Sequence, residues 1–72
     1  MSDTKSRRKA LGWSRRDLAE RTALDKRIIQ LVELGQWTES EALGRVEYVL
    51  SAGEAGDLEL RLPPLEEPTG SD

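Results

Sequence analysis

The side chains best suited to recognition are basic and amide groups at the start of an expected helix. Lys26, Arg27 and Gln30 fall in its first turns, directly after Asp25, whose carboxylate is a favourable N-cap. Arginine pairs bidentately with guanine, and glutamine with adenine, in the major groove of DNA. Any one of these residues is more simply interpreted as a solvated surface side chain, but the set favours the reading of base edges.

A second basic pair lies one expected helix earlier. Arg15 and Arg16 directly follow Ser14, which together with Asp17 has the spacing of a capping box. The free backbone N–H groups at such a helix start suit a phosphate.

Charge is divided unevenly along the chain, whose net charge is −3. Residues 1–27 hold nine bases and four acids, whereas residues 28–72 hold two bases and ten acids. A basic half of this kind suits contact with nucleic acid. The alternative is two solvated faces of opposite sign without a partner.

The composition excludes several classes of protein. The 72 residues suffice for one domain, and a chain of this length often needs a partner subunit for stability. Neither Cys nor His is present, so a disulfide framework, the usual zinc ligands and the commonest general base are missing. We therefore expect no enzyme activity, no metal and no cofactor. No apolar run approaches a membrane span or a signal peptide, and we expect a soluble, cytoplasmic protein.

Capping residues and glycines predict four helices in an all-α domain. The expected segments are Thr4 to Leu11, Ser14 to about Thr22, Asp25 to Leu34, and a helix capped by Thr38 or Ser40 that ends near Gly53. Ile29 and Val32 share the face of the third helix that packs on the second. The inward residues expected in the last helix are Leu43, Val46, Val49 and Leu50.

The pattern changes after residue 53. Residues 57–62 alternate polar and apolar with a period of two, which is typical of a half-buried strand. A single strand in a helical chain has no partner, so we expect residues 54–64 to pair across a dimer through Leu58, Leu60 and Leu62. Residues 65–72 are expected to form a flexible acidic tail.

The segment from Trp13 to Gly35 resembles the Cro/repressor (Xre) helix-turn-helix family. That family has an apolar residue, then Ser-Gln-x-x-Leu-Ala, a glycine turn, a short capped helix and Ile-x-x-Ile-Glu-x-Gly. The matching positions here are Ser14, Leu18, Ala19, Ile29, Val32, Glu33 and Gly35. With the last helix, the match covers roughly residues 5–50.

The resemblance implies a lambda-repressor-like bundle of four to five helices, in which residues 1–53 form the DNA-binding domain. It implies base contacts by Lys26, Arg27 and Gln30, and phosphate contacts by Arg15 and near Gln36. It also implies a structural ion pair between Arg8 and Glu33.

Several residues depart from the family pattern. Ala23 replaces the turn glycine, and Arg15 replaces a glutamine at a phosphate-contacting position. Leu31 and Leu34 stand where relatives are often polar, and they suit either thymine methyl groups or a protein partner. Trp13 is expected in the core between the first two helices, and Trp37 against the last helix rather than on DNA or a partner.

A single C-terminal strand after such a domain resembles the HipB-type antitoxins, which repress their own operon and bind a toxin. Two functions follow as expectations. The first is a homodimeric, sequence-specific repressor of transcription, with the autoregulating antitoxin of a toxin-antitoxin pair as its narrower form. The alternative is a protein-interaction module that keeps the helix-turn-helix fold without binding DNA, as Glu39, Glu41 and the net negative charge suggest.

Overall fold

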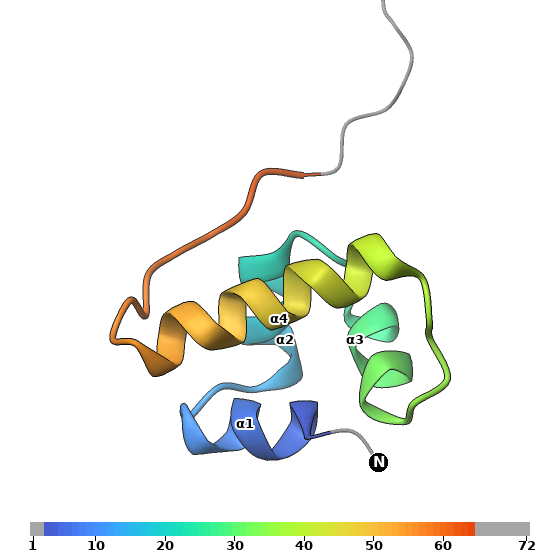
Figure 1. The fold of residues 1–72 in the computed structure, drawn as a ribbon, viewed down its shortest axis with the longest axis horizontal. Helices are drawn as coiled ribbons and strands as arrows, with labels where there is room; N and C mark the ends of the chain where they lie inside the picture. Colours follow the sequence, from blue (N-terminus) through green and yellow to red (C-terminus); the bar gives the residue numbers. More distant parts are fainter. Residues whose placement is uncertain (1–2, 65–72) are drawn as a thin grey trace, which may run out of the picture.

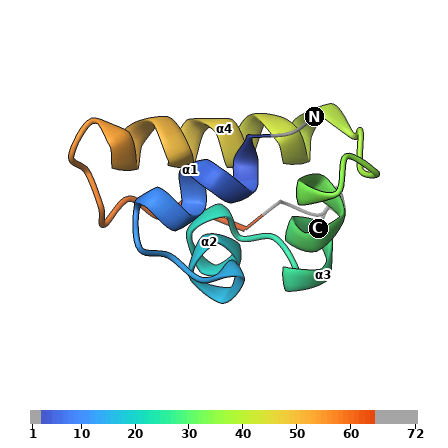
Figure 2. The same ribbon diagram turned by 90° about the horizontal axis from the view of Figure 1, so that it is seen from below.

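The computed structural model describes residues 3–64, and they form an all-helical unit (Figure 1). The helices are α1 (Thr4–Ala10), α2 (Arg15–Thr22), α3 (Lys26–Glu33) and α4 (Ser40–Glu54). Figure 2 shows α1, α2 and α3 on the same side of the long α4. The four helices predicted from the sequence are therefore present, with bounds that differ by a residue or two.

The starts of α2 and α3 follow from their capping residues. Ser14 Oγ accepts the Asp17 N–H at 3.0 Å, and an Asp17 carboxylate oxygen accepts the Ser14 N–H at 2.8 Å, which completes the predicted capping box. These hydrogen bonds from Ser14 hold the pKa of Asp17 below its ordinary value. Asp25 accepts the Arg27 N–H at 2.7 Å and starts α3 as predicted.

The turn between α2 and α3 has a left-handed residue that is not glycine. Ala23 has φ 59° and ψ 33°, so an alanine takes the left-handed conformation that favours glycine, and the turn keeps that conformation despite the strain. The adjacent Thr22 is fully buried and donates its hydroxyl to the Leu18 carbonyl at 2.8 Å. The short turn thus fixes the angle at which α3 leaves α2.

The core contains Ile29 and Val32, as predicted, together with Leu18 and the inner face of α4. One expected core residue is wrong: Leu43 is 38% exposed, and Ala42 is buried in its place. Ala42 stands four residues before Val46 on the buried stripe, whereas Leu43 is rotated about 100° toward the border. The cap of α4 also differs, because Glu39 rather than Thr38 or Ser40 accepts the Ala42 N–H.

Residues 57–64 follow α4 without forming a strand within the described chain. Their alternation of polar and apolar residues instead places Leu60 and Leu62 against the core while Leu58 stays 47% exposed. In place of the expected strand, the described chain has a turn at residues 58 and 59 followed by an irregular segment that packs on its own chain. Contact of this segment with a second subunit belongs to the proposed function below. Residues 65–72, the expected acidic tail, lie outside the described residues.

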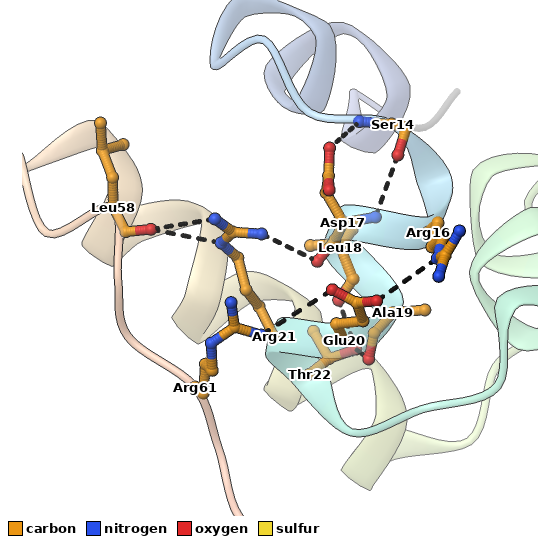
Figure 3. Close-up of polar contacts among 10 residues, drawn as sticks. All are labelled: Ser14, Arg16, Asp17, Leu18, Ala19, Glu20, Arg21, Thr22, Leu58 and Arg61. Atoms are coloured by element: carbon orange, nitrogen blue, oxygen red, sulfur yellow. Dashed lines mark hydrogen bonds and ion pairs between the residues drawn. The ribbon is translucent and has the colours of Figure 1, made fainter.

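Arginine side chains hold this C-terminal segment in place. The Arg21 guanidinium donates to the Leu58 carbonyl at 3.2 Å (Figure 3), and the Arg21 carbonyl accepts the Leu62 N–H at 2.8 Å. Arg45 donates to the carbonyls of Thr22 and Pro63. These bonds satisfy backbone groups that a neighbouring strand would otherwise pair.

Trp13 lies in the core, as predicted, and packs close to α4. A methyl group at Gly53 would lie 2.8 Å from Trp13 Cη2 and 3.0 Å from Leu11 Cδ1, so only a residue without a side chain fits there. The Arg21 guanidinium lies 4.5 Å from the Trp13 ring centroid, in cation–π geometry. Trp13 therefore joins α1, α2 and the C-terminal end of α4.

We expect Gly53→Ala to lower the free energy of unfolding by about 1–2 kcal/mol, because overpacking against Trp13 outweighs the better helix propensity of alanine. Gly44→Ala is the matched control on the same helix, since nothing lies within 4 Å of its added methyl group. It should raise the stability by roughly 0.5–1 kcal/mol. Urea unfolding of both variants tests this, and equal effects would contradict the close packing at Gly53.

A candidate nucleic-acid interface

A basic groove lies where α1 meets the N-terminal ends of α2 and α3. It has a volume of about 700 Å³ and is open to solvent. Ten residues line it: Lys5, Arg8, Lys9, Ser14, Arg15, Arg16, Asp25, Lys26, Arg27 and Gln30. Seven of them are bases and one is an acid, so the groove concentrates the positive charge of a chain whose net charge is negative.

Five of the six predicted DNA-contacting residues line this groove together, namely Arg15, Arg16, Lys26, Arg27 and Gln30. The sixth, Gln36, is exposed in the connection after α3 and is not part of the lining. Lys26, Arg27 and Gln30 are exposed, and their side chains make no hydrogen bond or ion pair within residues 3–64. They are therefore available to a ligand.

Lys5 and Lys9 extend the groove along α1, and they are not among the residues predicted to contact DNA. Their spacing of four residues places them on one face of the helix. That spacing was visible in the sequence. Without the position of α1 beside α2 and α3, however, it did not distinguish these lysines from solvated ones.

Glu33 is the buried anion behind the groove. Arg8 Nε donates to Glu33 Oε2 at 2.6 Å, and the side chains of the two residues are only 6% and 3% exposed. Arg8 also donates to the Trp13 carbonyl at 2.8 Å. This is the pair that the resemblance implies, and it ties α1 to the C-terminal end of α3.

Arg15 shares the same carboxylate. Its Nε donates to Glu33 Oε1 at 3.1 Å, while its side chain remains 42% exposed. The terminal guanidinium nitrogens of Arg15 have no partner within the described residues. Glu33 thus fixes Arg15 at the groove and leaves its outer nitrogens for an anion. Arg16, by comparison, makes only a solvent-exposed 3.4 Å contact with Glu20.

Several acidic side chains of the described residues pair with arginines rather than with one another. Within residues 3–64, no group of His, Cys, Asp or Glu side chains has the arrangement of a metal site. No helix in this range has the length and apolar character to span a membrane. The carboxylates of Glu47 and Glu54 instead bind Arg7, whose hydrogen bonds hold the pKa of both below the ordinary value.

No family model, curated protein or solved structure matches this chain. What the protein does must therefore be inferred from its own residues, geometry and charge.

We expect Glu33→Ala to lower the free energy of unfolding by about 3–5 kcal/mol, because it leaves the buried Arg8 without its counter-ion. Glu20→Ala removes a carboxylate from two exposed ion pairs and should change stability by less than about 1 kcal/mol. Urea unfolding is the measurement. The double variant Arg8→Met/Glu33→Leu should recover much of the loss, and similar stabilities for Glu33→Ala and Glu20→Ala would contradict the burial of this pair.

Proposed function

We propose that the protein is a sequence-specific DNA-binding repressor of the Xre helix-turn-helix type that acts as a homodimer. The observation that supports this most directly is the basic groove, in which the starts of two successive helices bring together five residues suited to phosphates and base edges. In this proposal α2, the turn at Ala23 and α3 form the helix-turn-helix, within a lambda-repressor-like domain.

The roles of the groove residues follow from their chemistry. Arg15 and Arg16 at the start of α2 contact phosphates, and Arg15 does so with the nitrogens that Glu33 leaves unbound. Lys26, Arg27 and Gln30 enter the major groove with α3 and contact base edges. Gln36 contacts the DNA backbone beyond the groove. Bound at a promoter, such a dimer represses by occupying the site.

The proposed dimer uses the segment that follows α4. Leu58 is exposed beside Leu60 and Leu62, which pack on their own core. Two copies of this segment pack against each other through Leu58 across a twofold axis, so that two copies of α3 face successive turns of the DNA. The antitoxin reading, with a toxin partner and a cytoplasmic location, is a narrower form of the same proposal.

A second candidate function is a protein-interaction module without DNA binding. It is favoured by Leu34, which is 60% exposed at the end of α3, and by the acidic residues Glu39 and Glu41 that follow. The basic groove favours the first candidate, because a surface for an ordinary protein partner does not require seven converging bases.

We expect Arg27→Ala to weaken binding to a selected duplex about tenfold or more and to relax the preference for one base, because a bidentate base contact is lost. Arg15→Ala should weaken binding to all duplexes and reduce the salt slope by about one. Arg61→Ala is the charge-matched control, since Arg61 is exposed outside the groove. Because Arg61 lies in the segment of the proposed dimer contact, sedimentation is used to check that this variant remains a dimer. Fluorescence anisotropy at several salt concentrations provides the measurement. Absence of duplex binding at low salt would instead support the protein-interaction module.

The full chain should sediment as a dimer, and Leu58→Glu should shift it toward the monomer. Leu58 is exposed, so this change removes an apolar contact between subunits without opening the core. Tyr48→Glu, at another exposed position on α4, is the control and should leave the dimer intact. Analytical ultracentrifugation distinguishes the two, and a monomeric wild-type chain at all concentrations would rule out the proposed assembly.

A further inference from the structure

We propose that Leu31 and Leu34 bind thymine methyl groups and so determine part of the base specificity of the DNA-binding function proposed above, on which this inference rests. The two leucines continue the exposed face of α3 that begins with Arg27 and Gln30.

The register of α3 places these four residues in one stripe. Leu31 follows Arg27, and Leu34 follows Gln30, each at a spacing of four residues. Leu34 is 60% exposed, and Leu31 is half-buried but does not belong to the apolar residues packed on the core. The opposite face of the helix carries the buried Ile29 and Val32.

The cap at the end of α3 does not cover Leu31 in the usual way. Gly35 has φ +75°, and the Gln36 N–H donates to the Leu31 carbonyl at 2.9 Å, which is the backbone pattern of a Schellman motif. The residue after the glycine in this motif commonly supplies an apolar contact to the helix. Here that residue is the exposed, polar Gln36, so the cap does not cover Leu31 with an apolar side chain.

The neighbouring charges favour DNA as the occupant of this stripe. Arg27 and Gln30 line the basic groove, so the same helix face carries both polyanion-binding groups and apolar groups. The thymine 5-methyl is the apolar group that a base pair presents in the major groove. Two leucines also form a smaller patch than the several hundred Å² that mark a typical protein interface.

The helix geometry gives the position of the thymine. Arg27 and Leu34 are seven residues apart, which is about 10 Å along the axis at ~1.5 Å per residue. This distance corresponds to about three base pairs at ~3.4 Å per step. A thymine contacted by Leu34 is therefore expected about three base pairs from the base that Arg27 reads.

The experiment begins with selection of preferred duplexes from a random pool by the full wild-type chain. The base whose preference relaxes in Arg27→Ala marks the Arg27 contact. Uracil then replaces each thymine two to four base pairs away, which removes only the methyl group. For the wild type we expect a loss of affinity of about fourfold at one position, as for one buried methyl group.

The variants Leu31→Ala and Leu34→Ala complete the test. At least one of them should bind the thymine duplex about as weakly as the wild type binds the uracil duplex, and should no longer distinguish the two. Leu43→Ala, at an exposed leucine on α4, is the matched control and should retain the full thymine preference. Circular dichroism of each variant checks that the helices remain.

Two outcomes separate this inference from the function on which it rests. If the wild type binds duplex through Arg27 but uracil is tolerated everywhere, or the double variant Leu31→Ala/Leu34→Ala keeps its full affinity, the leucines do not contact thymine and the inference is overturned. If no duplex binds even at low salt, the DNA-binding function itself fails.

Discussion

The fold depends on one buried carboxylate, that of Glu33. It stands at the last residue of α3 and receives hydrogen bonds from Arg8 on α1 and Arg15 on α2. A carboxylate that is 3% exposed is stable only when its charge is compensated, so three helices must come together at this point. The same convergence creates the groove, because α1 and the starts of α2 and α3 are the elements that line it.

The C-terminal part of the chain stabilises this arrangement from the other side. α4 passes across α2 (Figure 1) and also packs against α1, and the contact of Trp13 with Gly53 fixes its far end. The segment after α4 then returns across α2, where Arg21 and Arg45 bind its carbonyls. Because Arg21 also lies over the Trp13 ring, one side chain links the segment, α2 and the core. A short chain without disulfides thus buries more apolar surface than its helices alone would.

Local signals predicted much of this structure. Ser14, Asp17 and Asp25 fixed the helix starts because a cap acts within three residues, and the periodicity of Ile29 and Val32 identified the buried face of α3. The residues of the groove were mostly identifiable because two helix starts carry basic side chains close to each other in sequence.

Other features depend on tertiary packing and could not be derived locally. The alternation in residues 57–62 indicates that one side of the segment is buried. It does not specify whether a neighbouring strand or arginine side chains bind the backbone N–H and C=O groups of the segment. Lys5 and Lys9 join the groove only because α1 packs beside α3. Leu43 lies at the edge of the α4 stripe, where the position of neighbouring elements decides exposure.

The packing of α1 also explains how a chain with a negative net charge presents a basic groove to a polyanionic ligand. Arg7 faces α4 and binds Glu47 and Glu54, whereas Lys5 and Lys9 on the same helix line the groove. α1 therefore separates acidic α4 side chains, two of which are compensated by Arg7, from the bases of the groove. At physiological salt, charges farther apart than about 8 Å are largely screened, so a ligand in the groove responds to the local bases more than to the total charge. The net charge of −3 is for this reason a poor guide to what the groove binds.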